Sequence, residues 1–335
     1  MRQATPPNAW KLSLVRVLFH PRYQIASALL DRLHPFEFDR SLQVEAKLRQ
    51  QFGASWESLR STPERRTTLA ELSAVHEQGY LDRSHHSAVV AGVIEVHQLR
   101  WCPRFLMRRW FVTPSLWCTA GTVMGARQVL SEGLVYNIGG GFHHAKRTGG
   151  EGFCLFSDIA LAIATLRAQG QLSASDPIFY IDLDVHQGNG VSTDFGNDPA
   201  VRILDVFNSE IYPFRDRVAL AGIDVSRPLP SGTKDREYLE AVKEGLEELF
   251  RDQPIPKLVI YNAGTDIYKE DLLGDFAVSR EGVNERDRLV YEAVRGRGIP
   301  MLVLASGGYS KMSVQLIVDS IVSYLEREAS KDTPP

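Results

Sequence analysis

The chain has 335 residues, of which 44% are hydrophobic and 24% charged, as is ordinary for a soluble globular protein. Its 38 basic and 41 acidic side chains give a formal net charge of −3, which excludes a general electrostatic attraction to nucleic acid or to an anionic membrane. The three cysteines, Cys102, Cys118 and Cys154, are too few and too irregularly spaced for a disulfide framework, and the sequence has no signal segment and no membrane-spanning apolar run, so we expect a cytoplasmic protein.

The chain begins with helical patterns and continues with alternating strands and helices. Helical spacing of apolar residues covers 42–52, 67–72, 87–99 and 116–130. Short, continuous apolar runs at 134–138, 178–181, 201–206, 258–261 and 301–305 predict buried strands. Between and after them lie amphipathic stretches at 156–168, 235–250, 280–295 and 313–326. This alternation predicts a parallel sheet covered by helices on both faces, in one domain without internal repeats.

A glycine-rich loop follows the first of these strands. It reads Gly139-Gly140-Gly141-Phe142-His143-His144. Glycines let the backbone turn tightly and approach a ligand, so both histidines can face one cavity. The alternative is a glycine-rich turn with solvated histidines.

Carboxylates and a third histidine follow two other strands. In extended backbone, Asp182, Asp184 and His186 point to one face at the carboxyl end of the strand 178–181, where open α/β sheets place ligands. Asp266 follows the strand 258–261; taken alone, it is more typical of a helix cap. Asp184, His186 and Asp266 together supply the three protein ligands that catalytic zinc commonly has.

The last strand is followed by Ser306-Gly307-Gly308-Tyr309. The glycines allow the phenol of Tyr309 to reach the same cavity, where it can donate a hydrogen bond to a developing oxyanion. The alternative is an ordinary buried tyrosine beside a turn.

Together these elements resemble the histone deacetylase family. The resemblance rests on the glycine–histidine loop with Gly152-Phe153-Cys154, on DLDVHQGNG (182–190), on NAGTDIYKEDLLG (262–274) and on SGGYS (306–310). It implies a single three-layer α/β/α domain of the arginase/deacetylase type with a parallel sheet of about eight strands. The implied catalytic domain spans 15–328, between flexible ends at 1–14 and 329–335.

Several details resemble class IV of that family. Gln187 and Asn189 stand where classes I and II usually have His and Asp. The segments HPRY (20–23), LHPF (33–36), DVFNSEIYP (205–213) and YNAGTD (261–266) also read like class IV. Members of this class are associated with removal of long fatty-acyl groups from lysine.

The resemblance assigns roles residue by residue. It gives Asp184, His186 and Asp266 to Zn²⁺, and Tyr309 to polarising the substrate carbonyl. His144 is expected to act as general base and then general acid, with His143 in support and with Asp182 and Asn189 behind the two histidines. A further set lines an acyl-lysine channel: Gly152, Phe153 and Tyr212. The family often also binds K⁺, here matched by Asp182, Asp184, His186, Asp205 and Val206.

Asn189 is neutral where class I has a carboxylate. An imidazole without a carboxylate partner holds its proton less tightly, which makes His144 a free base but a weaker acid. We therefore expect weak turnover of acetyl-lysine and preference for a longer acyl chain. The alternatives are a deacetylase of acetyl-lysine or of small acetylated amines such as polyamines. Two readings from other classes are a two-manganese ureohydrolase and a non-catalytic acyl-binding module.

Overall fold

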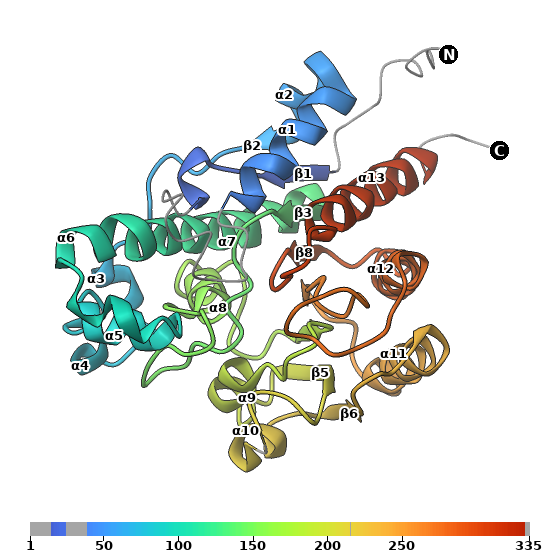
Figure 1. Ribbon diagram of the computed structural model, residues 1–335. Helices are drawn as coiled ribbons and strands as arrows, with labels where there is room; N and C mark the ends of the chain where they lie inside the picture. The colour runs from blue at the N-terminus through green and yellow to red at the C-terminus, as the bar shows by residue number, and fades with distance from the viewer. Residues whose placement is uncertain (1–14, 25–38, 215, 332–335) are drawn as a thin grey trace.

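The computed structural model describes residues 15–24, 39–214 and 216–331. Within these ranges a parallel sheet of eight strands runs through the molecule in the order β2-β1-β3-β8-β7-β4-β5-β6 (Figure 1). The strands are β1 (Val15–Leu18), β2 (Arg60–Ser61), β3 (Leu134–Asn137), β4 (Ile178–Asp182), β5 (Val201–Asn208), β6 (Val225–Leu229), β7 (Leu258–Asn262) and β8 (Met301–Leu304).

Long helices cover both faces of the sheet. The α-helices are α1 (Arg40–Phe52), α2 (Trp56–Leu59), α3 (Leu69–Leu72), α4 (Gln78–Leu81), α5 (Ser87–Val93), α6 (Arg104–Met107), α7 (Thr113–Glu132), α8 (Asp158–Ala168), α9 (Asn189–Phe195), α10 (Arg217–Ala221), α11 (Asp235–Phe250), α12 (Arg280–Arg295) and α13 (Ser313–Lys331). The 3₁₀-helices are η1 (Pro21–Tyr23), η3 (Gly53–Ser55) and η4 (His97–Trp101), and η5 (Arg108–Val112) is a π-helical turn.

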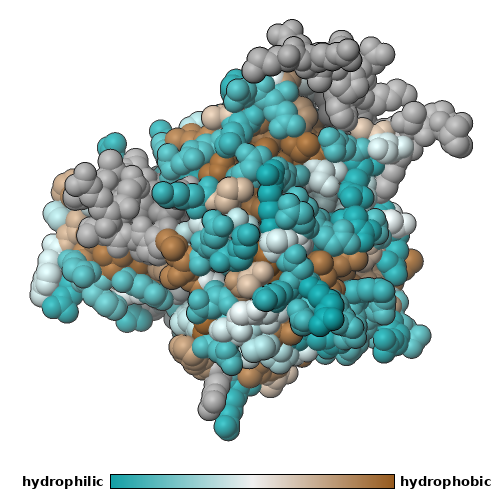
Figure 2. All heavy atoms as spheres, turned by 45° about the vertical axis from the view of Figure 1, so that its right-hand side comes forward, coloured by the Kyte–Doolittle hydropathy of each residue, from teal (hydrophilic) through white to brown (hydrophobic). Residues whose placement is uncertain are grey.

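Alternate residues of each central strand enter different hydrophobic cores. In β7, for example, Val259 and Tyr261 pack with α1, α11, α12 and α13, whereas Leu258 and Ile260 pack with α7, α8 and α9. Both faces of a strand are therefore apolar, which produces the continuous apolar runs of the sequence. Hydrophilic side chains prevail on the outer face that brings α11 to α13 forward (Figure 2).

The structure confirms the single α/β domain and the parallel sheet, and all five expected strands are present. Three strands escaped the sequence analysis because they are short or atypical. β2 has only two residues, and the apolar run of β1 is interrupted by the partly exposed Arg16. β6 is a partly exposed edge strand that contains Pro228.

Several expected boundaries differ. The pattern at 87–99 predicts one helix, but α5 ends at Val93, and Glu95 has a φ of 59°, which a continuous helix cannot contain. α13 continues to Lys331, three residues beyond the expected end of the domain at 328. The expected flexible segment 1–14, the last four residues of the expected flexible segment 329–335, and the motif at 33–36 lie outside the described residues. Across the ranges that the structure describes, every helix is too short or too polar to cross a bilayer.

The sheet order explains where the functional motifs meet. The strands that precede the four motifs, β3, β8, β7 and β4, are direct neighbours in the sheet. Because all run in the same direction, their carboxyl ends lie along one short edge. Loops that are up to 170 residues apart in the sequence therefore converge there.

The junction between these loops and the N-terminal helices contains a buried histidine. His76 Nε2 accepts a hydrogen bond from the backbone N–H of Ser157, 2.9 Å away, at the start of α8. Burial lowers the pKa of His76 to about 4. The ring is therefore neutral in the folded protein at pH 7.

We expect His76 to make the protein less stable in mild acid. Its folded pKa lies below the unfolded value of 6.5, so its contribution is present above pH 6.5 and is lost as the pH falls toward 4. Between pH 8 and 5.5 the loss is about 1.4 kcal/mol. Urea unfolding at both pH values should show this loss in the wild type and a smaller one in His76→Gln. An exposed control, His97→Gln, should keep the wild-type slope; equal slopes in all three proteins would contradict the assignment.

Candidate active site

Three side chains from two loops form a buried cluster. Asp184 and His186 follow β4, and Asp266 follows β7. His186 Nδ1 lies 3.2 Å from Asp184 Oδ1 and 3.2 Å from Asp266 Oδ2, and one ligand atom of each residue lies within 4.8 Å of the others. A ring N–H cannot point well at two acceptors at once, whereas a cation between the three atoms would satisfy all of them. The arrangement is therefore that of a metal site.

Fixed donors hold the two carboxylates in place. Asp184 Oδ2 accepts hydrogen bonds from Ser306 Oγ and from the N–H of Gly307, both at 2.9 Å. Asp266 Oδ1 accepts one from the N–H of Val185 at 3.0 Å. Each carboxylate thus keeps its other oxygen turned toward His186. A side chain at position 307 would not fit, because its Cβ would lie 2.3 Å from Asp266 Oδ2.

The charges of the cluster also call for a cation. Burial, followed by the neighbouring charge of Asp184, raises the pKa of Asp266 to about 7. Two buried carboxylates without a compensating charge are costly. One imidazole and two carboxylates are a ligand set that suits zinc, and three protein ligands leave a position open for chemistry. The residues present therefore fit a catalytic Zn²⁺ ion.

The glycine-rich loop after β3 places two histidines beside this cluster. Asp158 fixes the loop, since its carboxylate accepts hydrogen bonds from the N–H groups of Gly141 and Phe142, both at 2.9 Å. The ring centroids of His143 and His144 are 4.0 Å apart. Both rings are buried.

The first histidine is held by a carboxylate. His143 Nδ1 lies 2.9 Å from Asp182 Oδ2, which also accepts a hydrogen bond from the hydroxyl of Tyr180. Burial lowers the pKa of His143, but the charges of Asp182 and Asp184 outweigh it and raise the pKa to about 9. His143 is therefore a cation at neutral pH.

The second histidine is held by an amide. His144 Nδ1 lies 2.7 Å from Asn189 Oδ1. Burial, and then the nearby charges of His143 and His186, keep the pKa of His144 well below its usual value. His144 is therefore neutral at pH 7. Gly152, with a φ of 50°, lets the backbone pass this ring, because a Cβ there would lie 2.4 Å from His144 Cδ2.

The loop after β8 brings Tyr309 to the same place. The N–H of Tyr309 donates to Asp271 Oδ2 at 2.7 Å, and the guanidinium of Arg40 donates to the carbonyls of Ser306 and Gly308. The Tyr309 ring lies 6.3 Å from that of His186 and 5.8 Å from that of Phe153, centroid to centroid. A phenol at this position can donate a hydrogen bond to a substrate oxygen.

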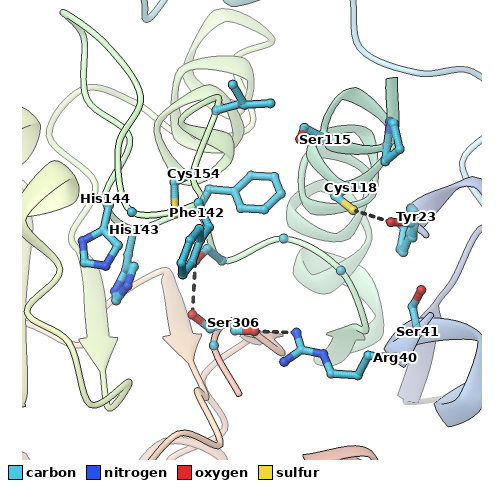
Figure 3. Close-up of a pocket in the computed structure, with 18 of the residues that line it drawn as sticks. Tyr23, Arg40, Ser41, Ser115, Cys118, Phe142, His143, His144, Cys154 and Ser306 are labelled. Atoms are coloured by element: carbon cyan, nitrogen blue, oxygen red, sulfur yellow. Dashed lines mark hydrogen bonds between the residues drawn. The ribbon is translucent and has the colours of Figure 1, made fainter. Parts of the chain in front are cut away.

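One cavity connects these groups. Its lining includes His143, His144, Asp184, Tyr309 and the expected channel residues Gly152 and Phe153. Figure 3 shows that it extends from the two histidines past Phe142 and Cys154 to Tyr23, Arg40, Ser41 and Cys118. Tyr212 is not part of this lining, but its ring centroid lies 5.1 Å from that of His144. The structure therefore brings together all the expected metal, histidine, tyrosine and channel residues.

The expected potassium residues lie behind the metal cluster. Asp205 is paired with Asp182 in the register of β5 and β4, and Val206 is buried next to it. Burial and the charge of Asp182 raise the pKa of Asp205 well above its usual value. Asp205 Oδ2 accepts from the N–H of Gly188, but Oδ1 is buried with no hydrogen-bond partner. An unpaired buried oxygen beside a second carboxylate fits a monovalent cation.

Four supporting residues were missed by the sequence analysis: Arg40, Glu151, Asp158 and Asp271. Asp158 and Asp271 carried a weak signal, because Asp158 lies four residues after Gly152-Phe153-Cys154 and Asp271 lies within the quoted segment 262–274. Arg40 carried none, since it is more than 260 residues from the loop that it holds.

Comparisons with known proteins identify relatives of this chain. The family model described as "Histone deacetylase domain" matches residues 34–325. This chain belongs to the histone deacetylase family. It is 39% identical to "Histone deacetylase 2" of Arabidopsis thaliana over 324 residues, which cover 97% of this chain and 82% of the relative. It is 26% identical to "Histone deacetylase 8" of Xenopus laevis over 262 residues, which cover 72% and 75%.

The fold agrees as well. The crystal structure of a histone deacetylase homologue from Aquifex aeolicus superimposes with a TM-score of 0.72 at 23% identity, covering 96% of this chain and 85% of that one. The family assignment makes this chain a hydrolase of the deacylase type, as the sequence predicted.

We expect one equivalent of zinc to bind through Asp184, His186 and Asp266. Loss of one of three ligands, in His186→Ala or Asp266→Asn, should weaken binding about a hundredfold or more, as measured by competition with a chelating dye. Tyr309→Phe is the matched control, because it changes the same cavity without removing a ligand atom. Zinc binding that survives His186→Ala would show that the ion is held elsewhere.

Proposed function

We propose that this protein is a zinc-dependent hydrolase that removes an acyl group from the side-chain amine of lysine. The observation that carries the proposal is that Asp184 of the three-ligand metal cluster, the histidine pair and Tyr309 line one cavity. A non-catalytic acyl-binding module would need none of the hydrogen bonds that set the two histidines apart. A two-manganese site would need a second set of ligands, and the described residues contain one such cluster.

The two histidines suit different tasks in this reaction. When bound, zinc acts as a Lewis acid that polarises the acyl carbonyl and acidifies water. His144 is neutral, so it can take a proton from the attacking water and then pass it to the leaving amine. His143 is cationic and tied to Asp182, so it stabilises negative charge that develops beside it. Tyr309 donates a hydrogen bond to the oxyanion.

We further propose that the enzyme prefers long fatty-acyl chains over acetyl and is of the class IV type. Support comes from Asn189 in place of a carboxylate and from the apolar part of the cavity lining. Beyond the histidines the lining includes apolar side chains of Ile94, Phe111, Pro114 and Leu155. An acetyl group would leave this part of the cavity unused, whereas a longer chain would gain about 0.8 kcal/mol per buried methylene.

The acyl preference is tested on one lysine peptide that carries acetyl, octanoyl or myristoyl. With zinc-loaded protein we expect kcat/KM to be at least tenfold higher for the long chains. Tyr309→Phe should lose turnover of all three. Ser115→Phe, which adds a ring to the cavity wall, should lower turnover of the long chains and spare acetyl.

The other outcomes are equally informative. Faster turnover of acetyl would make the enzyme a conventional deacetylase and refute the argument from Asn189. Turnover of an acetylated polyamine, but of no peptide, would identify a small amine as the substrate.

We also propose a potassium ion bound by Asp182, Asp184, His186, Asp205 and Val206, by side chain or backbone carbonyl. The unpaired Oδ1 of Asp205 supports it. We expect K⁺ to raise the melting temperature of the wild type by several degrees relative to choline at equal ionic strength. Asp205→Asn, which removes the charge, should abolish the difference; an equal rise in the variant would place the ion elsewhere.

A further inference from the structure

Asn189 is placed between His144 and two carboxylates. Its Oδ1 lies 2.7 Å from His144 Nδ1. On the other side, its Nδ2 donates to Glu151 Oε1 and lies 3.5 Å from Asp216 Oδ2. The side-chain amide thus joins the imidazole to a pair of acidic groups.

The chemistry of these partners fixes the orientation of the amide. Ionised carboxylates only accept hydrogen bonds, so the NH₂ end of Asn189 must face Glu151 and Asp216. The carbonyl end then faces His144, and a carbonyl also only accepts. His144 Nδ1 must therefore carry a proton, which leaves Nε2 as the bare nitrogen of the neutral ring.

Glu151 is itself held in place. Lys146 Nζ lies 3.1 Å from the same oxygen, Oε1, that accepts from Asn189. Lys146 and Glu151 both lie in the segment 146–154, in which backbone bridges join Lys146 to Gly149 and Glu151 to Cys154. The next residue, Gly152, packs against the His144 ring. One segment therefore contacts the ring directly and reaches its nitrogen through Asn189.

We propose that Glu151 is a positioning residue that acts through Asn189 to hold His144 in the tautomer with a proton on Nδ1 and a lone pair on Nε2. In class I a carboxylate at the position of Asn189 contacts this histidine directly. Here the carboxylate of Glu151 reaches it through the amide of Asn189. The effect on turnover rests on the proposed deacylase function. The tautomer itself does not, and it can be measured without any substrate.

Two substitutions of similar size separate the hydrogen bond from simple packing. Glu151→Met removes the nearer acceptor and leaves only the long 3.5 Å contact to Asp216, so Asn189 can turn over and present its NH₂ group to His144. Glu151→Gln keeps one acceptor oxygen, and Lys146 would hold that oxygen toward Asn189. Glu132→Met is the control, because Glu132 is also a partly buried carboxylate beside a cation, Arg16, far from the site.

The direct measurement is a long-range ¹⁵N–¹H correlation spectrum of the zinc-loaded protein with ¹⁵N-labelled histidine. The signals of His144 are identified by their loss in His144→Asn. We expect the proton on Nδ1 in the wild type, in Glu151→Gln and in Glu132→Met, and a proton on Nε2 in a substantial fraction of Glu151→Met. An unchanged tautomer in Glu151→Met, with a native melting temperature, would overturn the proposal.

Kinetics give the second measurement. We expect Glu151→Met to lower kcat about tenfold with little change in KM, and Glu151→Gln to stay within about twofold of the wild type. Asn189→Asp alone would crowd a third carboxylate against Glu151 and Asp216, and should be impaired. Combining Asn189→Asp with Glu151→Met relieves that repulsion and should recover most of the lost kcat; no recovery would count against the proposal.

The two proposals can fail separately. A tautomer that depends on Glu151 in a protein without deacylase turnover would support the positioning role and refute the proposed function. Deacylase turnover, together with a His144 tautomer that does not change in Glu151→Met, would support the proposed function and refute the positioning role.

Discussion

Four carboxylates, those of Asp182, Asp184, Asp205 and Asp266, are buried side by side at the carboxyl edge of the sheet. Like charges at such short range in a medium of low dielectric constant repel strongly unless something compensates them. Backbone N–H groups, the rings of His143 and His186, and the hydroxyl of Ser306 supply part of that compensation. The remaining negative charge favours cations at two places, the Asp184–His186–Asp266 cluster and the unpaired Oδ1 of Asp205.

The same electrostatic field separates two histidines that are neighbours in the sequence. His143 faces the carboxylates and gains a proton, whereas His144 faces an amide and the cationic ring of His143 and loses it. The difference arises from which loop packs behind each ring, since the two residues share one backbone and one degree of burial. An acid–base pair with distinct protonation states therefore requires no chemical difference between its members, only different partners.

The fold and the central side chains were predictable because strand ends leave a clear pattern. Asp184, His186, Asp266 and Tyr309 each stand just after a continuous apolar run, and parallel strands bring their ends together. The weak or short strands β1, β2 and β6 lack such a pattern. Glu151 was missed for another reason: its role depends on Asn189, which lies on a different element, and on the hydrogen-bonding ends of an amide. Such relations between loops have no period or spacing that a single sequence can display.

The position of β8 has a consequence for the order in which the protein takes shape. β8 lies between β3 and β7 in the sheet, although it is the last strand in the sequence.

 The chain advances 164 positions from the end of β3 at Asn137 to the start of β8 at Met301, but only 39 positions from the end of β7 at Asn262. During synthesis, the two halves of the sheet therefore emerge before the strand that joins them. Pairing over such a long sequence separation is slow, because the entropy of closing the loop is lost before the contacts form. Until β8 inserts, the carboxylate of Asp184 lacks the hydrogen bonds that Ser306 and Gly307 donate to it, and Tyr309 is not beside the metal cluster. The middle of the sheet and the active site can therefore be completed only after this last strand and the loop that follows it have been synthesised.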